Sequence, residues 1–470
     1  MAVGSPVRGG HCLCRCRDRA SGAGYIVTPF PLSEANPVEH RADLPARADV
    51  VVIGGGVIGV TTALFLARAG VSVVLVEKGR IAAEQSSRNW GWIRVQGRDP
   101  AEIPIAQEAQ RLWPALAREV DADIHLRQAG VLYLARDEAE MARYAAWLDL
   151  ARPYGVTTRL LDRAALLRHL PGAQGSWPGA MWTPSDMRAE PFVSVPALAR
   201  LAVAAGARIR EGCAARALDI EAGKVAGVVT EAGRLRAPAV VLAGGAWSSL
   251  FLRRHGVRLP QLSVRATAMR TGPLPEVFAG GAVDHRLAFR RRADGGYTLA
   301  PEGHHDFYIG PDAFRALRAY IPQLRSDPWG TQFRLAAPRG FPDSWTVARR
   351  WSPDSASPFE AMRVLSPAPN MGMVAQTRAA FAETFPQIGP VQIESAWAGM
   401  IDTLPDQVPV VAHVAALPGL TLATGMSGHG FGIGPAFGRI LADLVQGNAP
   451  GHDLARFRFA RFSDGSRIEI

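Results

Sequence analysis

The chain of 470 residues has almost no lysine, little cysteine and no long uninterrupted apolar segment. Lys78 and Lys224 are its only lysines, so its formal net charge of +10 comes from scattered arginines. A nucleic-acid interface would gather basic residues in a stripe or a recognisable module, and the sequence has neither. The composition therefore argues against a nucleic-acid partner.

The four cysteines do not form a framework. Cys12, Cys14 and Cys16 lie in the segment "HCLCRCRDR", and Cys213 stands alone. Alternate spacing would suit metal or redox chemistry, but no second His/Cys cluster completes a zinc pattern, so we expect no metal site. Cys213 is expected to be a small core residue. The absence of a disulfide pattern favours a reducing, cytoplasmic location.

No run of 18 residues is apolar and free of both charge and glycine. The closest candidate, residues 50–76, is interrupted by Gly54–Gly56 and by Arg68. It is better interpreted as a strand, a helix and a second strand than as a membrane span. The first residues contain arginines but no continuous apolar stretch typical of a secretory signal. We therefore expect neither a transmembrane segment nor a signal peptide.

The segment "ADVVVIGGGVIGVTTALFLARAGVSVVLVEKG" has the pattern of a dinucleotide-binding turn. A β-branched strand, Val50–Ile53, leads directly into Gly54, Gly56 and Gly59, which form G-x-G-x-x-G at the start of a helix. Gly54 permits the tight turn, Gly56 lets a pyrophosphate approach the backbone, and Gly59 permits close helix–strand packing.

Glu77 ends the second predicted strand, where an acid can accept both hydroxyls of an adenosine ribose. Its charge would repel a 2′-phosphate. These residues predict a bound dinucleotide but do not distinguish NAD from FAD.

Further motifs follow in a characteristic order: "SSRNWGWIR", "ALDIEAGKVAGVVTEAGRLRAPAVVLAGGAWS", "WAGMIDTLPDQVPVV" and "TGMSGHGFGIGPAFGRILADLV". With the glycine turn, they make the sequence resemble the FAD-dependent D-amino-acid oxidase / glycine oxidase / sarcosine oxidase superfamily. The resemblance covers about residues 48–450. It is highly specific for FAD binding and weakly specific for substrate.

The resemblance implies an α/β fold with α+β character in a second lobe. A Rossmann-like FAD-binding domain of glutathione-reductase type would be interleaved with a mixed-sheet substrate domain. The expected parts are a flexible tail (1–48), a discontinuous FAD-binding domain (49–98, 195–255 and 395–450), a substrate-binding domain (99–194 and 256–394) and a C-terminal tail (451–470).

The resemblance also assigns the FAD-binding residues. Gly54, Gly56 and Gly59 would hold the pyrophosphate, and Glu77 the ribose. The stretch toward the flavin would be lined by Ser86, Ser87, Arg88 and Asn89. The adenine would meet the backbone of Ala214 or Ala215, and the nucleotide would be covered by Gly244, Gly245 and Trp247. The flavin ring would be wrapped by the loop Gly428–Gly434, including Gly428, Gly430, Phe431 and Gly432.

The helix behind that loop is expected to begin at Pro435, a natural first-turn residue, with its N-terminus aimed at the flavin edge. Met400 stands near the position where some sarcosine oxidases attach flavin through cysteine, so we expect non-covalent FAD.

In the family, a hydride passes from the carbon next to nitrogen to the flavin, and the resulting imine is hydrolysed. Relatives acting on simple amino acids often carry an arginine just after the W-A-G motif. Here Ile401 or Asp402 stands there, which argues against plain glycine or D-alanine as substrate. Arg94, or one of Arg290–Arg292, could bind a carboxylate from another side.

Asp402 could meet a cationic group or cap a turn. We take Arg94, Asp402 and His429 as candidate catalytic residues. For His429, the alternatives are a hydrogen bond to flavin or substrate, or no role, because hydride transfer from a neutral amine needs no base.

The expected function is oxidation of the C–N bond of a D-amino acid, an N-substituted glycine or an opine-like substrate. The electron acceptor would be oxygen, or a quinone or other electron-transfer partner. Because neither lysine falls near the expected flavin, we favour a dehydrogenase or slow oxidase. The alternatives are a subunit of a heteromeric opine- or sarcosine-type oxidase, a non-catalytic flavin-binding protein and an NAD-dependent dehydrogenase.

Overall fold

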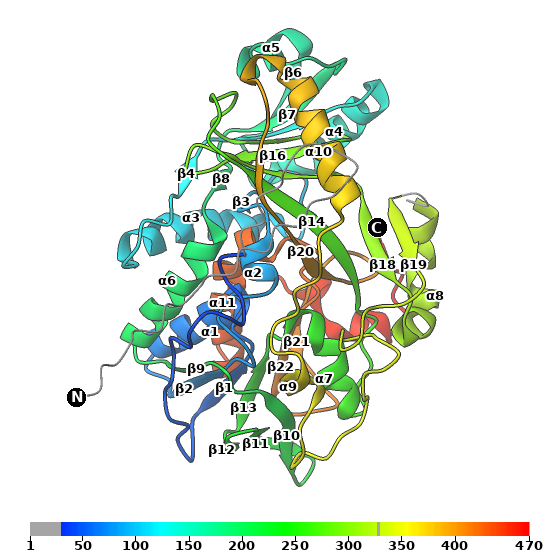
Figure 1. Cartoon of the computed structure of the whole chain (residues 1–470). Coiled ribbons are helices and arrows are strands. Elements are labelled where there is room, and N and C mark those ends of the chain that lie inside the picture. The colour runs from blue at the N-terminus through cyan, green and yellow to red at the C-terminus, as the bar shows by residue number, and fades with distance from the viewer. Residues whose placement is uncertain (1–29, 327–329, 470) are drawn as a thin grey trace, which may run out of the picture.

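The computed structural model describes residues 30–326 and 330–469. Two large sheets and two small ones form an elongated molecule, with most of the longer helices beside the lower sheet (Figure 1). Cys12, Cys14 and Cys16 lie outside the described residues. The helices are α1 (Val57–Arg68), α2 (Gln85–Arg88), α3 (Ile103–Glu119), α4 (Glu138–Ala151), α5 (Arg163–His169), α6 (Pro191–Ala204), α7 (Ser248–Arg254), α8 (Pro311–Ser326), α9 (Pro358–Ala361), α10 (Met371–Thr384) and α11 (Gly430–Gln446).

The first sheet has six strands and is mainly parallel. In spatial order they are β21 (Val410–His413), β22 (Leu420–Thr424), β13 (Ala239–Leu242), β1 (Val50–Ile53), β2 (Val73–Val76) and β9 (Arg208–Arg210). Only β21 runs antiparallel to its neighbour. All six strands lie within the segments 49–98, 195–255 and 395–450; the domain boundaries themselves stay a prediction.

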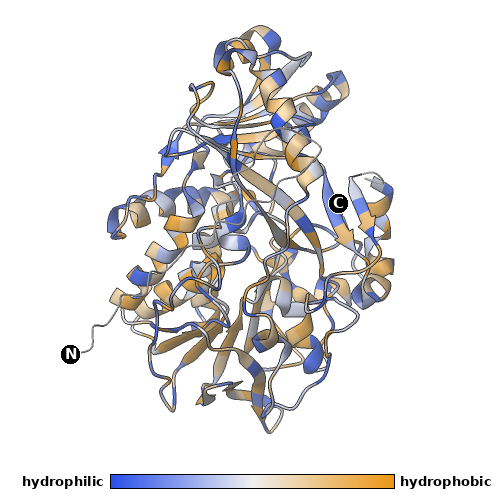
Figure 2. Cartoon of the chain, viewed as in Figure 1, coloured by the Kyte–Doolittle hydropathy of each residue, from blue (hydrophilic) through white to orange (hydrophobic). Residues whose placement is uncertain are grey.

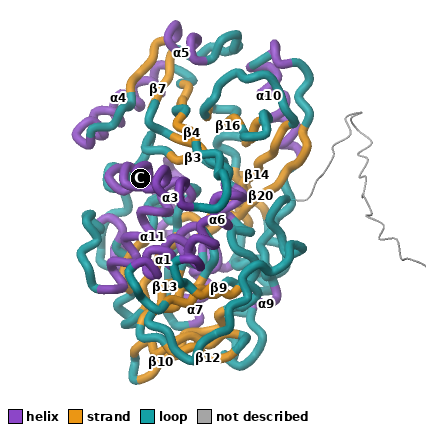
Figure 3. The backbone as a smooth tube through the Cα atoms, turned by 90° about the vertical axis from the view of Figure 1, so that its left-hand side faces the viewer, coloured by secondary structure: helices purple, strands orange, loops and turns teal. Residues whose placement is uncertain are grey.

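The two faces of this sheet are covered by different layers. Side chains alternate along a strand, so Val50 and Val52 join one apolar cluster while Val51 and Ile53 join another. Helices α1, α3, α6 and α11 cover the first face, as the side view shows (Figure 3). The second face packs against a three-stranded antiparallel sheet of β10 (Ala215–Glu221), β11 (Lys224–Thr230) and β12 (Gly233–Arg236).

The second large sheet has ten strands and is mixed. They are β19 (Thr331–Arg334), β18 (His305–Tyr308), β14 (Leu262–Thr271), β17 (Tyr297–Ala300), β16 (Ala288–Arg291), β15 (Gly281–Val283), β5 (Val131–Leu134), β7 (Gly179–Thr183), β6 (Arg159–Asp162) and β20 (Ile393–Thr403). The two longest strands, β14 and β20, pair along their whole length. A small sheet of β3 (Trp92–Ile93), β8 (Met187–Arg188) and β4 (Arg127–Gln128) lies near it (Figure 1). The expected α/β fold with a mixed second sheet is thus confirmed.

Helix α11 begins at Gly430, five residues before the expected start at Pro435. The glycines around the proline permit close packing instead of forming a loop. A Cβ on Gly434 would lie 2.6 Å from the Val57 side chain, and one on Gly438 would lie 2.2 Å from that of Thr61. Because α11 rests so closely on α1, tertiary packing holds the helix through its internal proline.

The expected tails are packed against the body within the described residues. Arg41 bridges to Arg210 in β9, and the backbone N–H groups of Glu39 and His40 donate to the Glu211 carboxylate. At the other end, Phe457 is fully buried and Arg461 is nearly so. The prediction of a flexible tail is therefore wrong for residues 30–48, since long-range contacts hold them. Residues 1–29 lie outside the described part.

Helix α8 has apolar residues at both buried and exposed positions, and its ribbon carries both hydrophobic and hydrophilic colours (Figure 2). Ala316 and Tyr320 pack inward with Phe307, while Phe314 and Leu317 are exposed. Among the helices of residues 30–326 and 330–469, none combines the length and apolar character needed to cross a membrane.

Candidate active site

A cavity of about 440 Å³ extends from the first sheet to the second. Its floor is formed where the parallel strands end, at Ile53, Val76, Leu242 and Thr424. Ligands of open α/β sheets bind at this carboxyl edge. The far end is lined by Tyr133, Val283 and Glu302 from the second sheet and its turns, so one cavity joins the two halves of the molecule.

The glycine turn between β1 and α1 has no room for side chains. Gly54 has φ +110°, and a Cβ there would lie 2.4 Å from the Ala243 carbonyl oxygen. A Cβ on Gly59 would lie 2.0 Å from the Gly54 carbonyl oxygen. Gly54 and Gly56 line the cavity, whereas Gly59 acts through packing below it. This geometry fits a pyrophosphate that approaches the backbone at a helix N-terminus.

Glu77, Ala215 and Trp247 lie together at one end of the cavity. The Glu77 carboxylate accepts backbone N–H groups from Gly55 and Gly79, both at 2.7 Å, which fixes its orientation. Burial raises its pKa, and the charge of Lys78 opposes that rise. Each carboxylate oxygen keeps a second lone pair for a ribose hydroxyl. These residues fit the adenosine half of the cofactor.

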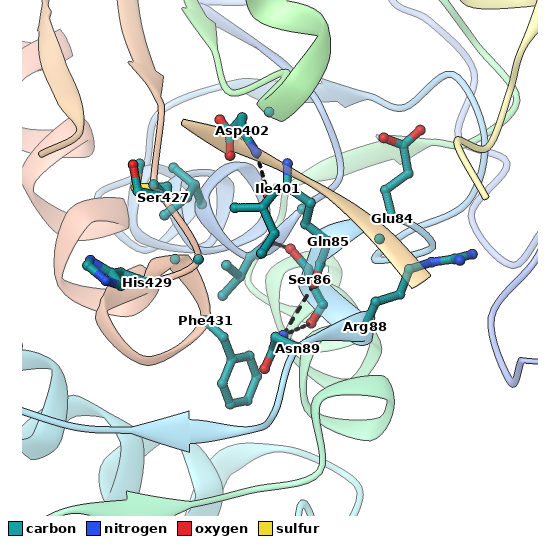
Figure 4. Close-up of a pocket in the computed structure, with 18 of the residues that line it drawn as sticks. Glu84, Gln85, Ser86, Arg88, Asn89, Ile401, Asp402, Ser427, His429 and Phe431 are labelled. Atoms are coloured by element: carbon teal, nitrogen blue, oxygen red, sulfur yellow. Dashed lines mark hydrogen bonds between the residues drawn. The ribbon is translucent and has the colours of Figure 1, made fainter. Parts of the chain in front are cut away.

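The segment of α2 that follows is held by its own polar side chains (Figure 4). Ser86 Oγ accepts the Val57 N–H at 2.9 Å, which satisfies a free donor at the start of α1. Asn89 Nδ2 donates to the carbonyl oxygens of Gln85 and Ser86. Ser86 and Asn89 line the cavity, as expected.

The other two residues of this segment turn elsewhere. Ser87 is buried beside a separate small pocket with Phe30 and Trp397. Arg88 touches the cavity wall, but its guanidinium points away from it (Figure 4) and donates to the carbonyl oxygens of Ala83 and Ala398. Ser87 therefore does not line the main cavity, and Arg88 connects α2 to β20 through its hydrogen bond to Ala398.

Gly428, His429, Gly430, Phe431 and Gly432 line the cavity at the start of α11. The first N–H groups of a helix have no partner inside it and carry partial positive charge. A helix N-terminus at this place fits the negative charge that a reduced flavin carries. These residues line the cavity, but the sequence assigns them to a loop, whereas all except Gly428 and His429 belong to the helix.

His429 precedes α11 and lies beside a buried acid. Its Nδ1 is 3.8 Å from Glu102 Oε2. Burial lowers the pKa of His429 to about 4, and the nearby charge of Arg98 acts in the same direction against the attraction of Glu102. The imidazole is therefore neutral above about pH 5. Within the described residues, no group of three or more His, Cys, Asp or Glu side chains could hold a metal ion.

We expect His429→Ala to leave the pH dependence of substrate oxidation unchanged between pH 6 and pH 9. The reason is that the folded-state pKa of about 4 lies below this range, so His429 changes no charge within it. Rates measured across the range with FAD-saturated protein test this. Loss of a kinetic pKa between 6 and 9 in the variant would show that His429 titrates as a base.

Asp402 is a structural acid, and its selection as a catalytic residue is not supported by its contacts. The side chain is 1 % exposed. Its Oδ2 accepts from Gly425 N at 2.7 Å, from Gln261 Nε2 at 3.0 Å and from Thr424 Oγ1 at 3.1 Å. These bonds anchor β20 to the turn after β22. Asp402 lines the cavity, but these three protein donors occupy its Oδ2.

The arginines proposed for a substrate carboxylate fall into two groups. Arg290 pairs with buried Glu190 at 2.8 Å, Arg291 with Glu276 at 3.7 Å and Arg292 with Asp294 at 3.0 Å, and none of the three lines the cavity. Arg94 does line it, with its guanidinium 5.4 Å from the centre of the Tyr133 ring and one N–H donating to the Gln96 carbonyl. The structure therefore leaves Arg94 for a ligand.

Sequence reasoning missed several polar residues of the cavity, among them Arg98, Tyr133, Glu302 and His304. Arg98 is buried, and its Nη1 has no partner in the structure. Glu302 and His304 come from "PEGHH" in the turn between β17 and β18. An acid and two histidines in one tight turn after an apolar strand are the only local signal that could have identified them.

The comparisons with known proteins agree with this geometry. The family model described as "FAD dependent oxidoreductase" matches residues 49–444. Glycine oxidase of Pseudomonas aeruginosa is 27 % identical over 87 % of this chain and 97 % of its own length. Human mitochondrial sarcosine dehydrogenase is 30 % identical over 47 % of this chain, which spans only about a quarter of that longer protein.

A solved structure shares the architecture over nearly the whole chain. L-Amino acid deaminase from Proteus myxofaciens, in complex with anthranilate, superimposes with a TM-score of 0.86. It is 30 % identical and covers 93 % of this chain and 98 % of its own. Sarcosine oxidase subunit beta of Rhizobium meliloti is 25 % identical over 92 % of both chains.

Proposed function

Because the chain belongs to the FAD dependent oxidoreductase family, we propose that it oxidises the C–N bond of an amino acid or secondary amine. FAD is the cofactor of this family. The observation that carries the proposal is the single cavity that joins the glycine turn and Glu77 to the charged residues of the second sheet. A dinucleotide at one end would thus face a small polar substrate at the other.

The residues of the first sheet would hold FAD. Glu77 would bind the adenosine ribose, the Gly54–Gly56 turn the pyrophosphate, and the first turn of α11 the flavin ring. When bound, FAD supplies the acceptor for a hydride. The described cysteine, Cys213, is buried and does not line the cavity, while Met400 is buried in β20, so we propose that FAD is held without a covalent bond.

Arg94 and Arg98 would bind the carboxylate of the substrate. Two guanidinium groups on one cavity wall repel each other, and the charge of Arg94 contributes to a pKa of about 10 for Arg98, after burial itself. An anion between them relieves that repulsion and supplies an acceptor for the unpartnered Nη1 of Arg98. This arrangement favours an α-amino acid, and the similarity to an L-amino acid deaminase makes the L-configuration the first to test.

The direct test is the visible spectrum of the purified protein followed by anaerobic addition of amino acids and amines. Flavin absorbance that a substrate bleaches supports the proposal. A colourless protein, or FAD that no member of a broad panel of L- and D-amino acids, N-methylglycine and opine-like amines bleaches, contradicts it.

We expect slow reoxidation by oxygen and fast reoxidation by a soluble quinone analogue. A cation beside the flavin speeds oxygen reduction in some relatives, but here Lys78 Nζ is held by Glu84, the Met362 carbonyl and the Arg363 carbonyl. Lys224 begins a surface hairpin strand and is exposed. Stopped-flow mixing of the reduced protein with each acceptor measures both rates, and rapid stoichiometric hydrogen peroxide would identify an oxidase.

A second candidate is the FAD subunit of a heteromeric oxidase. It is favoured by the end-to-end similarity with sarcosine oxidase subunit beta. In that case the native protein would elute from size exclusion with partner chains, and the isolated chain would bind FAD without turnover.

A further inference from the structure

Glu302 is a carboxyl group of the cavity that has no partner. Among residues 30–326 and 330–469, no described hydrogen bond or ion pair ends on its side chain, although it lies in the cavity wall with Arg94, Tyr133 and Val283. This contrasts with Glu77 and Asp402, whose carboxylates are occupied by backbone donors. Glu302 is partly exposed, and a carboxylate that loses part of its hydration without gaining a donor is destabilised unless it is protonated or binds a cation.

The surroundings of Glu302 do not supply that cation. Burial raises its pKa to about 7, and the charge of Arg94 opposes the rise only in part, while Asp284 and Glu140 add to it. Arg94 is itself the group left for an anion. Arg94 and Glu302 thus bring opposite charges to the wall of the same cavity.

The groups that face this carboxyl come from several elements. The ring of Tyr133 stands beside it from β5 and that of Tyr144 from α4, and the pKa values of both are raised, first by burial and also by the charge of Glu302. His304 follows Glu302 in the same turn, and His305 begins β18. Among the described residues, Arg94 is the cation with a leading influence on the pKa of Glu302, and the carboxylate of a ligand would occupy it.

We propose that Glu302 binds the ammonium group of an α-amino acid whose carboxylate lies on Arg94, and accepts one proton from it. The O–H bond forms on Glu302 as one N–H bond breaks, and the electron pair stays on nitrogen. The amine is then neutral, which is the form that can lose a hydride from the adjacent carbon. This inference rests on the proposed function, and it assigns Glu302 to binding the nitrogen of the substrate.

Two ligands that the protein cannot oxidise test the ammonium role of Glu302 separately from the proposed amino-acid site. 2-Aminoisobutyrate has a carboxylate and an ammonium group but no hydrogen on its α-carbon, and isobutyrate lacks the ammonium group. Calorimetric titration of the FAD-bound protein with each gives a preference, the dissociation constant of isobutyrate divided by that of 2-aminoisobutyrate. We expect this preference to fall about tenfold in Glu302→Gln and to stay unchanged in Glu383→Gln, an exposed control carboxyl.

Each result has one meaning. If neither probe binds the wild-type protein, the proposed amino-acid site itself is wrong. If both bind and Glu302→Gln keeps the wild-type preference, or weakens both probes equally, the ammonium role is overturned. Glu302→Gln could instead change only the relative affinities for ligands with lysine-like and leucine-like side chains. Glu302 would then face the substrate side chain, which also overturns the ammonium role.

The wild-type protein gives a second readout if Glu302→Gln does not fold. Since the folded-state pKa is about 7, the preference for 2-aminoisobutyrate should rise as the pH is raised from 6 to 8. His304→Gln, in the same turn, should keep this rise. A preference that does not change with pH, or a rise that disappears with His304, contradicts the proposal.

Discussion

Replacing Arg94 with methionine weakens isobutyrate binding about 100-fold while FAD stays bound. Arg94 lines the cavity and forms no ion pair within the described residues, and losing one partner of a desolvated, hydrogen-bonded charge pair costs about 2–5 kcal/mol. Because about 1.4 kcal/mol corresponds to each factor of ten in the dissociation constant, this cost includes the 100-fold loss of isobutyrate affinity. Methionine keeps an unbranched apolar stem but removes the guanidinium, so the cation–π contact with the Tyr133 ring is lost together with the charge.

Calorimetry on the FAD-bound protein measures the effect, with Arg143→Met as control. Arg143 is an exposed arginine of α4 that does not line the cavity. Equal affinities in the wild-type protein and Arg94→Met would remove Arg94 from the substrate site. A loss of FAD in the variant would instead assign Arg94 to the cofactor half of the cavity.

Replacing Gly59 with alanine yields protein without FAD. The added Cβ would lie 2.0 Å from the Gly54 carbonyl oxygen, and backbone cannot yield as a flexible side chain does. Helix α1 must therefore move off β1, which takes the Gly54–Gly56 turn out of position. We expect the free energy of unfolding of the apoprotein to fall by about 3 kcal/mol, the upper part of the range for overpacked cores.

Flavin absorbance per protein and denaturant unfolding of the apoprotein check both parts. Gly372→Ala is the matched control, because Gly372 also lies in a helix, α10, and a Cβ there would come no closer than 3.4 Å to its neighbours. Full FAD occupancy in Gly59→Ala would show that α1 adjusts without disturbing the turn.

Several site residues assigned from the sequence could be judged only from hydrogen-bond and ion-pair partners that lie far away in the sequence. Arg290 looks free in "FRRRADGG", yet Glu190, a hundred positions earlier, holds it in a buried pair. Asp402 follows the W-A-G motif where a substrate group is expected, yet Gln261, Thr424 and Gly425 surround it. No local sequence pattern predicts these partners.

The sequence alone determined the strand–turn–helix of residues 50–68, the acid at Glu77, the dinucleotide cavity they border and the family. These features depend on the spacing of neighbouring residues, which helix and strand periods convert directly into geometry. Tertiary structure decided where α11 begins, which carboxylates accept hydrogen bonds from the protein and which arginines line the cavity. It alone brings Glu302 from the β17–β18 turn opposite Arg94, because burial and charge pairing depend on segments some two hundred residues apart in the chain.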